Sequence, residues 1–317
     1  MNVVDEAIPR TLAGTQRGRW RGRLAAFVRL ALPPFLVFLA GMAVWYAISY
    51  LVLDEDRRFL LPPPHAVIRD GFMVGETGTE ILTGLLVSAQ VAFIGLAIAF
   101  VLGFVIAVLM SQAKWIERSL YPWAVFLQTV PILALVPLLG FWFGFGLMSR
   151  VIVCVIISLF PIIINTLNGL ISADRGLHDL LTLHNASRRT RLTKLQIPGA
   201  LPDIFIGLRT SAGLSVIGAI VADFFFGRGD KGLGLLLVQY SRRLQSEELL
   251  ATVIVACGFG VLVFTLFGVL GRRVVGTWSE AWGEQGRAGP DVAPAGLQDG
   301  LRTERVRGTG PQEGGMG

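Results

Sequence analysis

Long stretches without a charged side chain dominate the hydrophobic pattern of the chain. Asp, Glu, Lys and Arg are absent from five runs, residues 30–53, 81–113, 119–149, 151–173 and 249–271. Each run reaches or exceeds the roughly 20 residues with which a helix crosses the hydrocarbon core of a bilayer. A sixth stretch, 204–222, contains only Arg209, near one end, where its long side chain can reach the membrane interface.

The pattern therefore predicts an all-α membrane protein with six transmembrane helices within a domain over residues 30–273. We place the spans at about 30–53, 84–110, 120–143, 151–171, 204–222 and 249–271. Composition agrees, because 53% of the 317 residues are hydrophobic and only 16% are charged. Soluble globular proteins have about 25% charged residues, so an ordinary cytosolic enzyme is excluded, as is a disordered chain.

The two ends of the chain are more polar than the domain between them. Residues 1–29 are rich in arginine, and we expect a basic segment there that is disordered in part. Residues 281–317 change abruptly to Gly, Pro, Arg, Gln and Glu. Such a composition cannot bury enough apolar surface to offset the entropy of ordering, which predicts a disordered tail.

Basic residues concentrate on one side of the predicted membrane domain. With six spans, both termini share a side with the connections between spans 2 and 3 and spans 4 and 5, and most lysines and arginines lie there. Because cytoplasmic loops carry excess Lys and Arg, we assign this side, with the N- and C-termini, to the cytoplasm. The net charge of +6 then reflects orientation and attraction to membrane lipid, and a nucleic-acid partner need not be invoked.

Small residues and prolines indicate how the spans pack. Small side chains recur every four residues along two spans, at Gly95, Ala99, Gly103 and Ala107 and at Gly207, Ser211, Ser215 and Ala219. Such stripes let helix backbones approach closely, so we predict that both helices lie in the core. Pro131 and Pro137 predict a kink in the third span.

The sequence has no motif for nucleotide, metal or covalent chemistry. The only lysines are Lys114, Lys194 and Lys231, and none belongs to a GxxxxGK[ST] loop. Cys154 and Cys257 lie inside apolar runs without a CxxC or CxxH partner. No Ser/His/Asp set or carboxylate pair marks an active site, so we expect a non-catalytic chain that binds no cofactor or metal.

The connection between spans 4 and 5, residues 172–202, is longer than a helical hairpin needs. It is predicted to form two short helices that are broken near Asn185, the second closed by Ile197-Pro198 and Leu201-Pro202. A basic loop can simply satisfy the charge bias of the cytoplasmic side. Its length and internal break favour a docking surface instead, since long loops are often functional.

The same loop resembles the signature loop of ABC-importer permeases, written EAA-x3-G-x9-I-x-L-P. On this pattern Asp179, Leu180 and Leu181 take the EAA positions and Asn185 takes the glycine. The pattern continues through Ala186, Ser187, Leu195, Ile197 and Pro198. Asn replaces Gly at a position that we expect to be left-handed, a conformation that Asn also adopts.

Further motifs extend the resemblance over about residues 59–278. They are Leu60-Leu61-Pro62-Pro63-Pro64, Gln128-Thr129-Val130-Pro131-Ile132-Leu133-Ala134, Trp142-Phe143-Gly144-Phe145-Gly146, Phe160-Pro161-Ile162 with Asn165-Thr166, and Gly232-Leu233-Gly234. Their order is similar to that in the nitrate/taurine/sulfonate subfamily, which also handles thiamine- and riboflavin-type heterocycles. Residues 221–226 resemble the vitamin-precursor branch more closely.

The resemblance implies a type I ABC importer permease in the bacterial inner membrane. The family's loop binds a cytoplasmic ABC ATPase, which carries the ATP and Mg²⁺, while a periplasmic or lipid-anchored binding protein delivers a small nutrient. One set of six spans supplies half of a path, so we expect a homodimer. The alternative is a stand-alone secondary transporter, a class that usually shows paired repeats and buried ionisable residues, neither of which the sequence shows.

Polar residues in the spans are candidates for the substrate path. They are Gln128, Thr129, Asn165, Ser211, Ser215 and, at the outer end of the fifth span, Asp223. Hydrogen bonding between helices is the competing interpretation for each of them. Asp223 is interpreted either as part of an outer gate or as an ordinary charge at the membrane interface.

Overall fold

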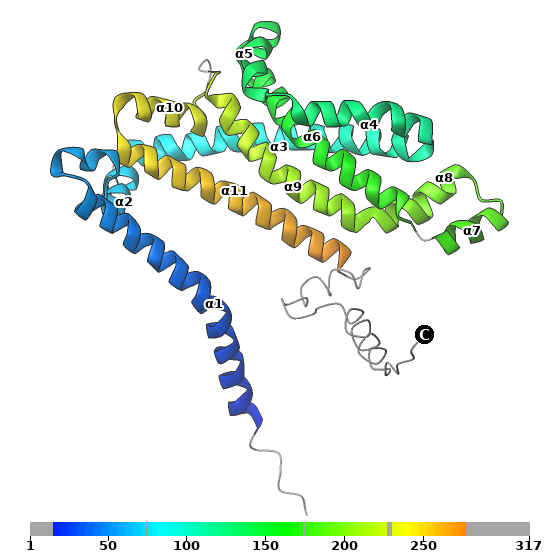
Figure 1. The fold of residues 1–317 in the computed structure, drawn as a ribbon, viewed down its shortest axis with the longest axis horizontal. Coiled ribbons are helices and arrows are strands. Elements are labelled where there is room, and N and C mark those ends of the chain that lie inside the picture. Colours follow the sequence, from blue (N-terminus) through cyan, green and yellow to red (C-terminus); the bar gives the residue numbers. More distant parts are fainter. Residues whose placement is uncertain (1–14, 74, 174, 227–229, 277–317) are drawn as a thin grey trace, which may run out of the picture. The chain divides into compact units, whose positions relative to one another are not determined.

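The computed structural model describes residues 15–73, 75–173, 175–226 and 230–276, and all regular secondary structure in these ranges is helical (Figure 1). The longer helices are α1 (Thr15–Ala47), α3 (Gly75–Gln112), α4 (Lys114–Thr129), α5 (Ile132–Phe143), α6 (Leu147–Ile171), α9 (Ile197–Asp223) and α11 (Ser246–Val275). The described residues contain five helices that are long and apolar enough to cross a membrane, or six when α4 and α5 count as one broken span. The predicted all-α membrane class is confirmed, whereas the predicted tail 281–317 lies outside the described residues.

Short helices connect the long ones. They are α2 (Pro64–Phe72), α7 (Arg175–Leu183), α8 (Arg188–Arg191) and α10 (Leu233–Arg243), with the π-helical turns η1 (Ile48–Val52) and η3 (Leu192–Gln196) and the 3-10 turn η2 (Glu55–Leu60). Helices α2 and α10 were not predicted from the sequence. Pro64 begins α2, where its fixed φ suits a helix start. Trp45 holds the preceding segment by donating its Nε1–H to the Pro62 carbonyl at 3.0 Å.

Helix α3 is longer than its predicted apolar span, 84–110. Its first turns contain Glu76 and threonines whose hydroxyls donate to carbonyls of the same helix, Thr79 to Gly75 at 2.8 Å and Thr83 to Thr79 at 2.9 Å. At the other end the Ser111 hydroxyl donates to Val108 at 2.7 Å. Polar residues that bond within the helix thus extend it past the hydrophobic run, which is why hydropathy alone placed its ends too far inward.

The predicted third span, 120–143, is not a single helix. α4 and α5 are separated at Val130-Pro131 and are bent by 97° from one another. Proline lacks the N–H that would continue the helical ladder, and it drives the preceding residue to an extended conformation. Val130 accordingly has φ −63° and ψ 127°. The proline kink was predicted, but its size, a complete break, was not.

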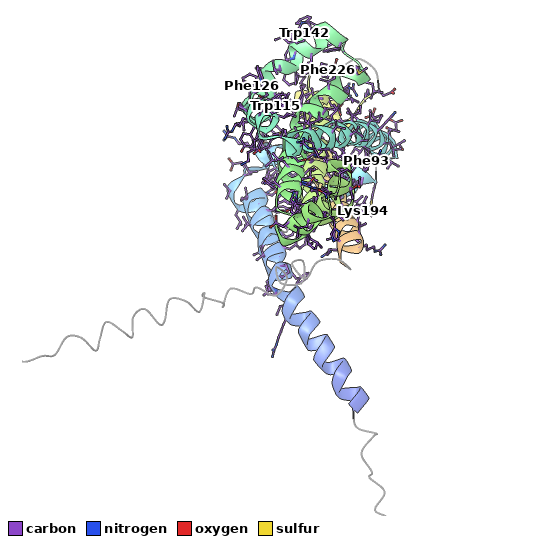
Figure 2. The ribbon with its side chains drawn as sticks, turned by 90° about the vertical axis from the view of Figure 1, so that its right-hand side faces the viewer. Phe93, Trp115, Phe126, Trp142, Lys194 and Phe226 are labelled. Atoms are coloured by element: carbon purple, nitrogen blue, oxygen red, sulfur yellow. The ribbon has the colours of Figure 1, made fainter. Side chains whose placement is uncertain are left out.

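Helix α4 exposes large aromatic side chains. Trp115 is 71% exposed and Phe126 is 57% exposed (both are labelled in Figure 2). A membrane-spanning chain tolerates such side chains because lipid tails are as apolar as they are.

The chain divides into two compact units. The first takes in the described residues of Met1–Val91, Leu135–Arg150 and Ala219–Phe259, and the second those of Ala92–Ala134, Val151–Gly218 and Gly260–Gly317. The core of the first contains Val67, Ile81, Leu233, Leu236, Tyr240 and Ala251. The core of the second contains Ala107, Met110, Ala124, Leu159, Ile163, Leu167, Leu170, Ala200 and Ile204.

Small residues bring helices together within the second unit, as predicted. A Cβ on Gly103 of α3 would lie 2.8 Å from the Ile162 side chain of α6. A Cβ on Gly207 of α9 would lie 2.9 Å from the Pro161 carbonyl of the same α6. Ala99 and Ala107 are completely buried. The stripes are therefore packing surfaces in the interior of the protein.

The predicted closure of the second loop helix at Pro198 and Pro202 is wrong. α8, η3 and α9 run on without a break, so that residues Arg188–Asp223 form one helical segment of 36 residues. In the π turn the Ile197 N–H bonds to the Leu192 carbonyl, five residues back. This wider turn changes which backbone carbonyls face Pro198. In a regular α-helix, Pro198 would lack the N–H for the i→i−4 hydrogen bond and its ring would clash with the carbonyl four residues back. A π turn and proline together thus let the helix continue.

Arg209 does not extend toward a helix end as its position in the sequence suggested. Its guanidinium carbon lies 4.0 Å from the centre of the Phe264 ring of α11. A Cβ on Gly268, one turn further along α11, would lie 3.1 Å from the Arg209 Nε. The absence of a side chain at 268 thus leaves room for a cation–π contact inside the second unit.

Candidate functional site: a buried ion pair and a helical loop

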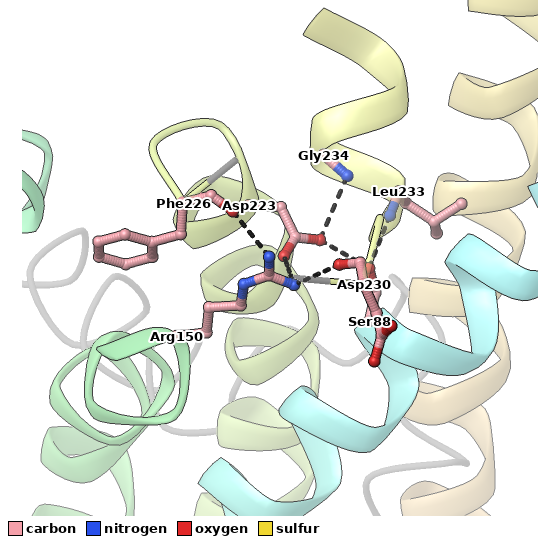
Figure 3. A network of polar contacts seen from close by, with 7 residues as sticks. All are labelled: Ser88, Arg150, Asp223, Phe226, Asp230, Leu233 and Gly234. Atoms are coloured by element: carbon pink, nitrogen blue, oxygen red, sulfur yellow. Dashed lines mark hydrogen bonds and ion pairs between the residues drawn. The ribbon is translucent and has the colours of Figure 1, made fainter. Parts of the chain in front are cut away.

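A buried ion pair lies in the first unit, where α9 ends and α6 begins (Figure 3). The Arg150 Nη1 and Asp223 Oδ1 are 3.1 Å apart, and the two side chains are only 4% and 0% exposed. Ser88 of α3 donates its hydroxyl to Asp223 Oδ2 at 2.8 Å. Ionised groups are rarely buried unless they are paired in this way, and losing one partner typically costs about 3–5 kcal/mol.

The same arginine holds the segment that follows α9. Arg150 Nη2 donates to the Phe226 carbonyl at 2.7 Å, and Nη1 donates to the Asp230 carbonyl at 3.0 Å. The Phe226 ring is completely buried and packs edge-on against Phe145, with ring centres 6.0 Å apart. One guanidinium therefore fixes both described ends of the connection 226–230.

Asp223 is joined in turn to the start of α10. Ser88 Oγ accepts the Leu233 N–H at 2.8 Å, and Asp223 Oδ2 accepts the Gly234 N–H at 3.4 Å. A Cβ on Gly232 would overlap the Asp223 carboxylate, and one on Gly234 would lie 2.6 Å from the Asp223 Cβ. The Gly-Leu-Gly motif thus lets the backbone reach a buried carboxylate.

This network was not predicted from the sequence. Arg150 was expected in an outer loop, and Asp223 was expected to be either a gate residue or an ordinary interfacial charge. The second interpretation of Asp223 is wrong, because its side chain is buried and paired. One feature was available to find the site: Arg150 is the single charge between two apolar runs, and ionisable residues inside membrane domains are usually paired.

The other path candidates lie in the second unit and do not form one cluster. Gln128 and Thr129 are exposed at the end of α4. Asn165 of α6 is half-buried and donates its Nδ2 to the Pro161 carbonyl at 2.7 Å. Ser211 donates to the Ser158 carbonyl at 2.6 Å, joining α9 to α6, and Ser215 donates to Ala212 at 2.8 Å. The Ser211 hydroxyl thus joins two helices, whereas the Ser215 hydroxyl bonds within α9, and a role in a path stays a prediction for all of these residues.

The loop 172–202 breaks at Asn185 in the way that the sequence predicted. Asn185 has a φ of 50°, which is left-handed. The Ala186 N–H bonds to the Leu181 carbonyl at 2.9 Å, and the Asn185 N–H bonds to the Thr182 carbonyl at 3.0 Å. This pair of bonds is the Schellman motif that closes many helices, usually with Gly and sometimes with Asn at the left-handed position. Ser187 then begins α8 by accepting the Thr190 N–H at 3.2 Å.

The two halves of the loop motif differ in exposure. On α7, Asp179 is exposed, while Leu180 is 50% exposed and Leu181 is half-buried. Beyond the Asn185 turn, Ala186 is half-buried and Ser187 is exposed, and Leu195, Ile197 and Pro198 are half-buried. The Ile197 side chain packs against the core of the second unit. The C-terminal part of the motif is therefore packed against the protein core, whereas its α7 part is exposed.

The family described as "Binding-protein-dependent transport system inner membrane component" matches residues 95–276, more than half of the chain. The chain belongs to this family. The permease is thus a non-catalytic, multi-pass inner-membrane subunit of an ABC transporter, as the motifs predicted.

Individual relatives agree with the predicted subfamily. The formylaminopyrimidine transport permease protein ThiX of Halalkalibacterium halodurans is 32% identical over 234 residues, which cover 74% of this permease and 91% of the relative. The putative aliphatic sulfonates transport permease protein SsuC of Bacillus subtilis is 27% identical over 270 residues, covering 85% and 94%. Permeases named for taurine and nitrate are also similar.

A solved structure is similar in fold. The crystal structure of an amino acid ABC transporter with histidines gives a TM-score of 0.54 at 18% identity, covering 64% of this permease and 98% of that chain. At this identity the similarity supports the permease fold alone. The orientation of the termini stays a prediction.

Proposed function

We propose that this permease forms the path by which an ABC importer takes up a small nutrient. A substrate-binding protein delivers the nutrient on the outer side, and a separate ABC ATPase on the cytoplasmic side binds and hydrolyses ATP with Mg²⁺. The proposal extends the established permease role to two partners. Its main support is the loop 172–202, which combines the family's motif with an outward-facing helix.

Helix α7 is suited to bind a groove in a partner protein. Leu177 and Leu180 are each 50% exposed and Leu183 is 81% exposed, and they are three residues apart along the helix. Residues at this spacing lie on one face, and an exposed apolar face is typical of helices that dock into grooves. Asp179 adds an exposed charge beside that face. We infer that this surface contacts the ATPase.

The continuous helical segment offers a way to transmit the ATPase cycle. A segment of 36 residues is about 54 Å long, and it begins just after the α7 turn and ends at Asp223. ATP binding would move α7 and, through this segment, the outer end of α9. Shifting a two-state equilibrium from 1:99 to 99:1 requires about 5.5 kcal/mol of differential binding, which a docked helix can supply.

We propose further that two copies of the chain enclose the path on a two-fold axis. One copy supplies at most six spans and a single loop of the family's motif, which is half of a symmetric path. Homo-oligomers usually have closed symmetry, and two-fold dimers are by far the commonest. Gln128, Thr129, Asn165, Ser211, Ser215 and Asp223 remain the candidates for lining the path.

The names of the relatives suggest a first set of substrates to test. Specificity in such importers rests mostly with the binding protein. The binding protein that associates with this permease should therefore be tested with a formylaminopyrimidine, an aliphatic sulfonate, taurine and nitrate. We favour the heterocycle, because residues 221–226 resemble the vitamin-precursor branch and ThiX is 32% identical.

Co-purification tests the coupling to an ATPase. The variant Leu180→Glu/Leu183→Glu places charges on the exposed face of α7, and Asn185→Ile disfavours the left-handed turn by about 1–2 kcal/mol. Both should lose the ATPase during purification while the permease stays folded in detergent. Asp56→Arg, on the exposed turn η2, is the matched control and should retain it. Normal ATPase recruitment and transport in both loop variants would contradict the proposal, and a wild-type permease that always purifies alone would favour a secondary transporter.

A further inference from the structure

A polar pocket opens where the loop 172–202 meets the end of α3. Its volume is about 180 Å³, and all of its lining residues are polar: Ser111, Gln112, His178, Arg188, Arg191 and Gln196. They come from α3, α7, α8 and η3 and belong to the second unit. The pocket is distinct from the outward leucine face of α7.

The pocket carries positive charge that no carboxylate balances. No acidic residue lines it, and none of the ion pairs among the described residues involves Arg188 or Arg191. The two arginines are three residues apart on α8, so they lie on the same helix face. The Nε of Arg191 is buried and has no hydrogen-bond partner in the described part of the chain.

The free donors point to an anion with several acceptor oxygens. Ser111 and Gln112 bond within α3, Ser111 Oγ donating to Val108 at 2.7 Å and Gln112 Nε2 to Ser111 Oγ at 3.1 Å. Arg191 is therefore the lining residue with a buried, unpartnered donor, and the exposed Arg188 adds a second positive charge beside it. A guanidinium presents a planar fork of N–H donors that fits phosphate oxygens in pairs, and such charge-assisted bonds are strong.

The position of the pocket identifies the source of the phosphate. Ser111 and Gln112 line the pocket at the very end of the candidate membrane span Gly75–Gln112, just past the apolar run of α3. A membrane helix that ends here would put the pocket near the lipid head groups, where basic pockets beside membrane helices bind anionic lipid. We propose that it binds the phosphate of an anionic phospholipid head group. This site does not depend on the proposed import cycle.

A bound lipid would join two parts of the permease. Arg188 and Arg191 belong to the loop, whereas Ser111 and Gln112 belong to the membrane helix α3. A phosphate between them would hold the base of the loop at the bilayer surface without covering Leu180 and Leu183 of α7, which do not line the pocket. Because the arginines would otherwise repel each other, removing the lipid should loosen α8.

Lipid retention by the full-length permease tests the proposal. Native mass spectrometry and thermal unfolding in detergent would be measured with phosphatidylglycerol, phosphatidylcholine or inorganic phosphate added. The test variant is Arg188→Gln/Arg191→Gln. The control, Arg189→Gln/Lys194→Gln, removes two charges from the same segment at residues that do not line the pocket (Lys194 is labelled in Figure 2). Arg188→Lys/Arg191→Lys keeps both positive charges but removes the planar set of guanidinium N–H donors.

The wild type should retain phosphatidylglycerol and melt at a higher temperature with it than with phosphatidylcholine. The test variant should bind it about tenfold or more weakly, the lysine variant should lie between, and the control should stay close to wild type. If the test variant does not fold, the lysine variant provides the comparison. Equal loss in test and control variants would overturn the site, as would full retention by the test variant. Equal stabilisation by inorganic phosphate would overturn the lipid assignment, and loss of the ATPase with unchanged lipid retention would assign the arginines to a partner carboxylate.

Discussion

The Arg150 guanidinium lies 3.1 Å from the Asp223 carboxylate, and both side chains are almost completely withdrawn from solvent. The pair joins the first turn of α6 to the last residue of α9, and its remaining donors and acceptors hold the loop and the start of α10. The described connections between α6, α9 and α10 in the first unit therefore depend on this pair.

Removing the carboxylate charge should strongly destabilise the permease. Asp223→Asn leaves the Arg150 charge buried without a counter-ion, and we expect a loss of about 3–5 kcal/mol. Thermal unfolding in detergent measures it. Glu55→Gln is the matched control. Glu55 pairs with Arg58 at an exposed site, so losing its charge should reduce stability by less than about 1 kcal/mol. Adding Arg150→Met to Asp223→Asn should recover part of the loss; equal melting of Asp223→Asn and the control would contradict the assigned role.

Replacing glycine with alanine should destabilise the permease at one position and not at another. Gly232→Ala places a Cβ against Asp223 and 2.8 Å from Ser88 Oγ, and we expect a loss of about 1–3 kcal/mol. Gly258→Ala, within α11, meets nothing within 4 Å and should be neutral or stabilising by up to about 1 kcal/mol. Melting temperatures of the two variants test the pair, and a Gly232→Ala protein as stable as wild type would show that the backbone need not approach the carboxylate.

The Arg209–Phe264 contact should contribute to the stability of the second unit. Phe264→Leu keeps an apolar side chain but removes the aromatic face below the guanidinium, and we expect a loss of about 0.5–2 kcal/mol. Phe38→Leu, on α1, is the control because Phe38 is 64% exposed and has no such contact in the described structure. Comparable melting of the two variants would argue against a cation–π contribution.

Because of Tyr240, the stability of the folded permease should fall at alkaline pH. Burial raises the pKa of Tyr240, and the hydrogen bond that its hydroxyl donates to Glu80 at 3.0 Å raises it further. The folded state thus keeps a proton that the unfolded state loses near pH 10, so the stabilisation is complete below about pH 10 and is lost as the pH rises above it. The melting temperature of wild type should fall more steeply above pH 10 than that of Tyr240→Phe. Tyr121→Phe, at an exposed tyrosine, should follow wild type, and identical slopes for all three would refute the prediction.

The features that were predictable are those that short stretches of sequence determine. Charge-free runs long enough to cross a bilayer as a helix predicted the spans. Small residues at every fourth position predicted the close packing of α3 and α9. Asn185 was expected in a left-handed turn because few other residues adopt it, and its φ is 50°.

The features that were missed depend on residues far apart in the chain. Arg150 and Asp223 look like two separate charges at the ends of apolar runs until folding places them together. The continuation of α8 into α9 was missed for a different reason. A proline predicts the end of a helix if the helix is a regular α-helix. No pattern in the sequence indicates the π turn at 192–196, which allows the helix to continue through Pro198.

That π turn determines how α9 is rotated about its own axis relative to α8. Each residue of an α-helix advances the chain by about 100° around the axis. Inserting or deleting one residue within 192–196 would rotate α9 by that angle, turning Ser211 away from Ser158 and Asp223 away from Arg150. The loop can therefore change its residues far more freely than its length, and single-residue indels there should be as damaging as the loss of the ion pair itself.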